Sequence, residues 1–530
     1  MNRNTNSPFA NVPEIHTDRS KFEIPFNHKT TGNTGDLIPF YVDLSVLPGD
    51  THKISTSIII RSMTPLKPVM DLAYADTYFF FIPNRILWNH WKNFMGENTN
   101  GAWVESTEYT VPQLTTPSGG ITKGSIADYM GIPTNAKGVS VSALPFRAYI
   151  KTYNEWFRDQ NLIAPLTEYE DDTDRTMNMS SSVLGGPCLK VAKGHDYFTS
   201  ALPQPQKGNA ISMPLGISAP VKSNGNQIKI KDPNYPNNEY GLGFSSTTSV
   251  ADTMIGQGAG AGNAGHAVIF GSQSGLYTDL TQATAATINA LRLSFQTQRL
   301  LEKDARGGSR YREIIRNHFN TTIPDATVQI PEYLGGTRIQ IKMDQVNDTS
   351  SNLGNTGAFS LTNDINEDFT KSFCEHGIIL GLISIRTLHT YQQGINKLWF
   401  KKQRFDFYDP VFAYLGEQPI RNKEIFATGS STDEQIFGYQ EAWAEYRYHP
   451  NRISGEMRSD YALSLDVWHY GDDFANLPTL GKTFIEETTS NVARTLAVTT
   501  QDQWLFDIAV IDEAVRPMPI NSVPGLIDHM

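Results

Sequence analysis

Residues 438–459, "GYQEAWAEYRYHPNRISGEMRS", concentrate side chains that could do acid–base chemistry. Two carboxylates, Glu441 and Glu445, stand four residues apart among tryptophan, tyrosine and arginine side chains. On a helix the two carboxylates would lie roughly 6 Å apart, close to the separation in glycosidases, whereas on a strand their backbones would lie roughly 13 Å apart. The segment therefore presents a choice between a carbohydrate-active enzyme and a structural element.

The alternation of residues 441–448 favours a strand. One face would carry alanine and tyrosine, and the other glutamate, tryptophan and arginine, until Pro450 ends the pattern. On a strand the two carboxylates are too far apart for catalysis, so we expect no catalytic residue. We expect Glu445, Arg447 and Arg452 to be charge-paired. The residues assigned to the subunit framework or to an interface are Glu441, Trp443, Glu445, Arg447 and Arg452. A carbohydrate-active enzyme and a carbohydrate-binding module remain the alternatives.

Other motifs lack the context that their chemistry requires. The glycines of "GAGNAG" at 260–265 fit a dinucleotide-binding spacing, but "HAVIFG" follows where a helix should begin. "GKT" at 481–483 lacks the first glycine of a P-loop, and the two cysteines cannot build a typical zinc site. "EYEDDTD" at 168–174 is more typical of a solvated acidic loop than of a calcium site. We expect no metal and no cofactor.

Two basic and aromatic stretches have the composition of a single-stranded nucleic-acid site. Cations contact phosphates and rings stack on bases in such sites. "KLWFKKQRFDFYDP" contains the residues assigned to single-stranded DNA, Trp399, Lys401, Lys402 and Arg404, and "RGGSRYREIIRNHF" at 306–319 holds four arginines. The alternative is that the rings lie in the core and the charges lie at the surface or an interface.

Composition limits what the whole chain can bind. Its 530 residues carry 44 basic and 55 acidic side chains, a net charge of −11, so nucleic-acid binding cannot be a global property. The N-terminus has no apolar segment like that of a signal peptide, and the longest apolar run, residues 377–385, is half of what spans a bilayer. We expect a soluble chain made in the cytoplasm, without membrane insertion.

Strand patterns dominate and surround a glycine-rich insertion. Alternating or continuous apolar runs predict strands at 37–44, 52–61, 75–83, 461–470 and 503–512. Helical spacing predicts helices at 145–161 and from 287 to the glycines of "ARGGSR" at 305–310. Residues 208–285 carry 12 of the 41 glycines and no arginine. We expect an extended arm at 1–30, a β core at 31–207 and 286–530, and an inserted subdomain between its halves. The insertion is marked by Gly208, Gly256, Gly260 and Ala285.

Several long blocks resemble a known family. "HDYFTSALPQPQKG", "LLEKDARGGSRYREIIRNHF", "YQQGINKLWFKKQRFDFYDPVFAYLGEQPI", "FGYQEAWAEYRYHPNRISGEMRS", "LDVWHY" and the terminal "PGLIDH" are similar to the major capsid protein of Microviridae, especially its gokushovirus branch. The resemblance covers nearly the whole chain and is weakest over residues 208–285.

The resemblance implies a mainly β fold, a viral eight-stranded antiparallel jelly roll with long inter-strand loops, a few short helices and a large inserted subdomain. It implies pentamers that build a T=1 icosahedral shell of 60 copies around circular single-stranded DNA. The insertion would protrude at the three-fold axes and contact a host surface receptor. Implied partners are an internal scaffolding protein, a small basic DNA-packaging protein and a minor pilot protein, in the virion and, during assembly, in the host cytoplasm.

Overall fold

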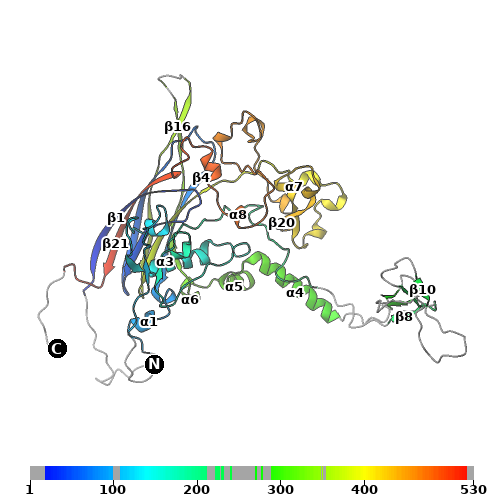
Figure 1. The fold of residues 1–530 in the computed structure, drawn as a ribbon, viewed down its shortest axis with the longest axis horizontal. Coiled ribbons are helices and arrows are strands. Elements are labelled where there is room, and N and C mark those ends of the chain that lie inside the picture. The colour runs from blue at the N-terminus through cyan, green and yellow to red at the C-terminus, as the bar shows by residue number, and fades with distance from the viewer. Residues whose placement is uncertain are drawn as a thin grey trace, which may run out of the picture. The chain divides into compact units, whose positions relative to one another are not determined.

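The computed structural model describes most of the chain (Figure 1). Described residues are 18–98, 108–211, 221–226, 228–231, 239–241, 269–270, 276–278, 288–347, 349 and 354–521. The chain divides into two compact units, the first of Met1–Pro205 with Asp304–Met530 and the second of Gln206–Lys303.

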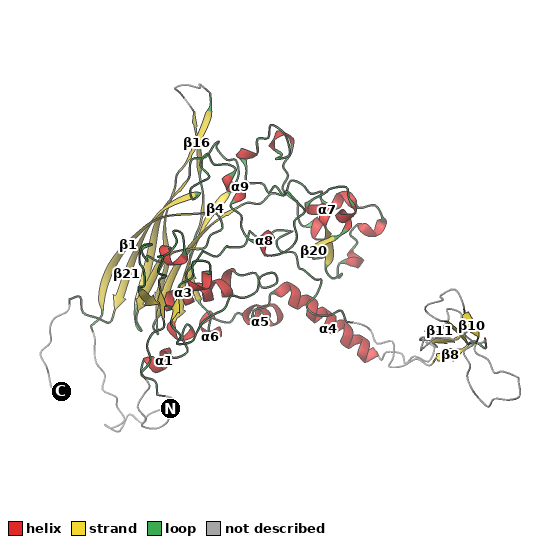
Figure 2. Cartoon of the chain, viewed as in Figure 1, coloured by secondary structure: helices red, strands yellow, loops and turns green. Residues whose placement is uncertain are grey.

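Two antiparallel sheets form the first unit's β-sandwich (Figure 2). One sheet has the order β1 (Ser20–Gly32), β21 (Trp504–Arg516), β3 (Thr51–Ser62) and β17 (Thr362–Ser372). The other has the order β13 (Glu332–Gly335), β4 (Ala73–Pro83), β18 (Gly377–Thr387) and β2 (Ile38–Val46), with β14 (Arg338–Gln340) also beside β4. The chain passes repeatedly from one sheet to the other, so neighbouring strands are distant in sequence. β13 and β14 pair with successive parts of β4, so they occupy one strand position and each sheet has four positions, which agrees with the predicted eight-stranded jelly roll.

Hydrophobic patterning explains why the sheets pack as they do. In β3 alternate residues are buried, and Ile54 and Ile58 point into the core between the sheets. In β4 nearly every residue is buried, because Phe79 faces that core while Phe80 faces a second core beneath α3 (Leu144–Thr152). The continuous apolar run in β4 therefore reflects a strand covered on both faces, as the sequence predicted.

Long connections carry the helices and short strands. The longest links β4 to β13 and contains the second unit. The remaining helices are α1 (Trp91–Phe94), α2 (Ile126–Tyr129), α4 (Ile288–Gly307), α5 (Tyr311–Phe319), α6 (Asp325–Val328), α7 (Asn422–Ile425), α8 (Lys482–Ile485) and α9 (Ser490–Ala493). Short ladders in the first unit join β5 (Gln113–Thr115) to β6 (Ser140–Ser142) and β7 (Arg175–Thr176), β15 (Met343–Asn347) to β16 (Thr356–Ser360), and β19 (Gln418–Arg421) to β20 (Ile436–Gln440). None of the described helices is both long and apolar enough to cross a membrane.

Predicted and observed elements differ at several places. Both predicted helices are present, as α3 and α4, and α4 ends at Gly307, within the predicted glycines, whereas α5 was not predicted. The strand predicted at 461–470 is wrong: the segment is a loop with a 3₁₀ turn at Asp466–Trp468. Its alternating leucines, including exposed Leu463, find no partner strand among the described residues. Within the predicted arm, Ser20–Gly32 forms β1, which pairs with β21 at the edge of its sheet.

The second unit contains two small sheets of its own. One has β9 (Lys229–Lys231) between β10 (Glu239–Gly241) and β11 (Ile269–Phe270), and the other joins β8 (Val221–Ser223) to β12 (Leu276–Thr278). The predicted insertion lies within this unit. Gly208 has a left-handed backbone, with φ of 84°. Gly256, Gly260 and Ala285 lie outside the described residues.

Candidate functional site: a buried ion pair beneath an aromatic ridge

Within residues 438–459, the strand β20 extends only to Gln440. β20 pairs with β19, whose Gln418 is opposite Gln440, and in the described part of the chain no strand pairs with the residues that follow. The chain instead turns at Trp443, which has a φ of 65°, and forms a 3₁₀ turn at Ala444–Tyr446. The strand predicted over 441–448 is therefore wrong, and both carboxylates lie in a turn.

Glu445 forms a buried ion pair with Lys401. The Lys401 Nζ lies 2.7 Å from Oε1 of Glu445, and both side chains are only 5% exposed. The same ammonium group lies 4.2 Å from the ring centroid of Tyr446 and 5.1 Å from that of Trp443. Glu445 thus pairs with a lysine distant in sequence rather than with Arg447, the pairing expected on a strand.

Of the other predicted residues of this segment, Trp443 is buried, Glu441 is partly exposed, and Arg447 and Arg452 are exposed. Arg447 pairs with Glu441 at 2.8 Å, and its Nη2 also donates to the carbonyl of Ala442. Arg452 is exposed and forms no ion pair in the described part of the chain. Because the two carboxylates pair with different cations, Glu445 with Lys401 and Glu441 with Arg447, they do not form the converging pair that a glycosidase requires.

A second buried carboxylate, Glu424 on α7, lies beside this ion pair. The Tyr197 hydroxyl donates to its Oε2 at 2.9 Å, and the Arg421 amide donates to its Oε1 at 2.9 Å. Burial raises the pKa of Glu424, and the negative charge of Glu445 adds to this increase. Sequence reasoning missed Glu424 and Tyr197, because nothing in either local segment indicates a contact across 227 positions.

Glu424, Glu445 and Tyr197 line a cavity of about 210 Å³. Tyr197 and Tyr448 stack in its wall with ring centroids 5.3 Å apart and planes inclined by 6°. Trp399 and Arg452 also line it.

Above the ion pair, residues 397–415 form a surface that we call the aromatic ridge. It consists of three 3₁₀ turns, Lys397–Phe400, Arg404–Asp406 and Pro410–Phe412. Its large apolar side chains project into solvent, and Trp399 and Tyr414 are 76% and 98% exposed. The exposed set is Trp399, Phe405, Phe407, Tyr408, Val411, Tyr414 and Leu415.

The structure separates the four residues assigned to single-stranded DNA. Lys401 is buried and paired with Glu445, although it also lines the cleft that contains Lys402. Lys402, Arg404 and Trp399 are exposed on the aromatic ridge. Three of the four thus remain available to a ligand.

A separate charged network is buried around the imidazole of His389. Its Nδ1 lies 2.7 Å from Asp472 and its Nε2 lies 3.0 Å from Glu487. Burial opposes protonation, but the two carboxylates outweigh it and raise the pKa of His389 to about 9. Burial alone would raise the pKa of Asp472, but the imidazolium holds it at about 2. Lys193 adds a second cation, 3.3 Å from Asp472.

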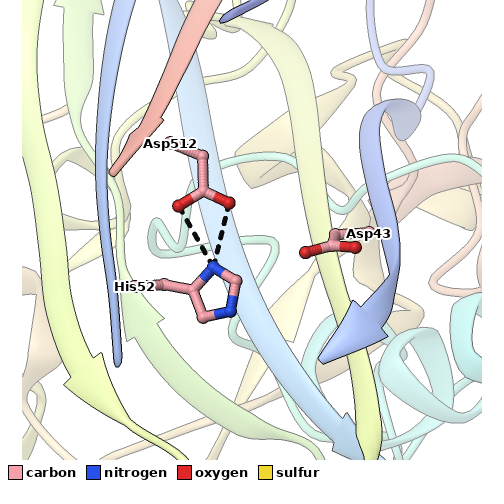
Figure 3. A group of neighbouring side chains, drawn as sticks. All are labelled: Asp43, His52 and Asp512. Carbon is pink, nitrogen blue, oxygen red and sulfur yellow. Dashed lines mark hydrogen bonds and ion pairs between the residues drawn. The ribbon is translucent and has the colours of Figure 1, made fainter. Parts of the chain in front are cut away.

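Asp43, His52 and Asp512 form a third cluster, between strands of the two sheets (Figure 3). Burial opposes protonation of His52, but its hydrogen bond to Asp512, at 2.9 Å, raises the pKa. The other ring nitrogen faces Asp50 at 3.4 Å, and Arg516 lies 3.6 Å from Asp43. The guanidinium of Arg516 also lies 3.2 Å from Asp50, so the cluster contains a cation of its own and joins strands of the two sheets.

Comparison with known proteins identifies the family. Residues 10–526 match the family described as "Capsid protein (F protein)". The chain belongs to this capsid-protein family. It is 44% identical to the capsid protein VP1 of Bdellovibrio phage phiMH2K over 99% of this chain and 98% of the relative. Identity to the capsid protein VP1 of Spiroplasma virus 4 is 39%, over 96% of both chains, and to that of Chlamydia phage 1 it is 36%, over 98% and 97%.

These full-length matches confirm the resemblance to microvirus capsid proteins stated from the sequence. The protein is a viral capsid subunit that assembles with its own copies into a shell. The aromatic ridge, the buried ion pair and the jelly roll are therefore parts of a building block.

Proposed function

We propose that this capsid protein forms a T=1 icosahedral shell of 60 copies, built from pentamers, around circular single-stranded DNA, and that it performs no catalysis. The observation that carries the proposal is full-length similarity to VP1 capsid proteins on an eight-stranded jelly roll. Many moderate contacts between copies suit such a shell, because multivalency makes the whole stable while single contacts remain reversible.

The acidic chain needs help to enclose a polyanion. Its net charge of −11 cannot neutralise phosphates, so we assign that role to counterions and a small basic DNA-packaging protein. Local contacts to the DNA would come from Lys402, Arg404 and Trp399. Lys402 and Phe405 line a cleft of about 480 Å³ that offers both a cation and a ring.

The glycine-rich insertion, residues 208–285, is assigned to the outer surface. An exposed tip rich in small residues tolerates change without loss of the shell, which suits contact with a host receptor. Assembly would take place in the host cytoplasm with an internal scaffolding protein and a minor pilot protein, and would end in the virion.

The experiment is expression of the chain followed by sedimentation through a sucrose gradient. We expect the wild-type protein to form megadalton particles or pentamers. A variant that lacks residues 208–285 should still assemble but should no longer attach to host cells. A wild-type protein that stays monomeric at high concentration refutes the shell. A deletion that attaches normally refutes the role of the insertion.

A further inference from the structure

The aromatic ridge concentrates large apolar side chains that the folded subunit leaves in water. Trp399, Phe405, Val411 and Tyr414 are each at least 70% exposed, within a stretch of 16 residues between 399 and 414. Scattered exposed apolar residues are ordinary, but a contiguous group marks an interaction site. Tryptophan and tyrosine are also the side chains that contribute most to binding at protein interfaces.

The ridge is held in place by hydrogen bonds to its backbone. Asp406 accepts from the amides of Lys402 and Gln403 at 2.9 and 2.7 Å. The Tyr408 amide donates to the hydroxyl of Tyr446 at 3.1 Å, and the Trp443 indole donates to a ridge carbonyl at 2.9 Å. The buried Lys401–Glu445 pair ties the same segment to the subunit. Such a surface loses little conformational entropy when a partner binds.

We infer that residues 405–415 of the aromatic ridge dock onto a second copy of this chain and form a contact between subunits of the shell, beside the ridge residues proposed to contact DNA. The inference rests on the proposed function, which requires the protein to bind itself. The chain belongs to a capsid-protein family, so a second copy is the partner that such a surface would meet in a shell.

A nucleic-acid strand fits residues 405–415 less well than a protein surface does. The charged residues of this part are Asp406 and Asp409, and their carboxylates repel a polyanion. Its most exposed part, from Val411 to Leu415, contains no basic residue, and aliphatic side chains do not stack on bases as rings do. A surface rich in aromatic residues and poor in charge is typical of the centre of a protein interface.

The first test compares the assembly of a variant altered on the ridge with that of a variant altered at an exposed apolar residue outside it. Val411→Ser/Tyr414→Ala changes the ridge and keeps its cations, and Leu463→Ser is the control, because Leu463 is 78% and Val411 81% exposed. We expect the ridge variant to raise the concentration needed for assembly about 30-fold, the loss typical of an interface hot spot. The control should assemble like the wild type. Equal assembly of all three proteins overturns the inference.

The second test places a photoreactive amino acid at Tyr414 in otherwise wild-type protein. Equal amounts of ¹⁵N-labelled and unlabelled chains are assembled, irradiated and digested. Cross-links between labelled and unlabelled peptides support docking on a second copy, and cross-links only to DNA or within one chain overturn it. If the wild type forms no particles, the proposed shell fails. Cross-linking of concentrated protein then still decides whether the ridge binds a second copy.

Discussion

Lys401→Met should destabilise the subunit strongly, because it leaves the Glu445 carboxylate buried without its cation. Both side chains are 5% exposed and their charged atoms lie 2.7 Å apart. Removing one partner of a buried ion pair typically costs about 3–5 kcal/mol. The neighbouring carboxylate of Glu424 adds repulsion, so we expect the upper part of this range. The free energy of unfolding is measured by urea denaturation of unassembled subunits, followed by tryptophan fluorescence.

Two further variants make this prediction specific. Lys401→Met/Glu445→Gln removes both charges and should recover most of the lost stability, because no buried charge remains uncompensated. Arg447→Met breaks the exposed pair with Glu441 and should cost at most about 1 kcal/mol. The reasoning is refuted if Lys401→Met costs no more than Arg447→Met. If Lys401→Met instead lowers the DNA content of particles at unchanged stability, Lys401 contacts DNA, as the sequence had suggested.

Three other substitutions test the surrounding structure. The pKa of His389 is about 9 in the folded protein and 6.5 in the unfolded chain, so protonation of His389 stabilises the fold by roughly 3 kcal/mol. This stabilisation is complete below pH 6.5 and is lost as the pH rises to 9. His389→Gln should therefore flatten the curve of stability against pH between 6.5 and 9. Burial raises the pKa of Asp368 from 3.8 to about 6, so its charge destabilises the fold at pH 7. Asp368→Asn keeps an acceptor for the Thr56 hydroxyl and should raise the free energy of unfolding by roughly 3 kcal/mol at pH 7 and leave it unchanged at pH 3. A Cβ on Gly394 would lie 2.0 Å from the Glu424 carbonyl oxygen, so Gly394→Ala should cost about 1–3 kcal/mol in urea denaturation. An unchanged pH curve for His389→Gln would contradict the first argument, and unchanged stability of Asp368→Asn at pH 7 the second. An unchanged urea midpoint for Gly394→Ala would contradict the third.

The sequence predicted the strands of the sandwich because their patterns report burial directly. β3 alternates, since one face packs on the core, and β4 is apolar throughout, since both faces are covered. The same reasoning failed at 441–448 and 461–470. Alternation there is not matched by a neighbouring strand, and a strand needs a partner for its backbone hydrogen bonds as well as a pattern.

The candidate site was predictable in its residues but not in its pairings. Composition drew attention to Glu445 and Lys401, yet assigned them to two different roles. Their contact joins positions 44 apart, and that of Glu424 with Tyr197 joins positions 227 apart. Such contacts depend on how the long loops fold together, which local spacing does not encode.

Electron cryo-microscopy of the purified, assembled protein tests the central claim most directly. The account predicts closed icosahedral particles of 60 jelly-roll subunits, with density from a neighbouring subunit against residues 397–415. A solitary subunit, or a closed shell in which these residues face empty solvent on every copy, would contradict it.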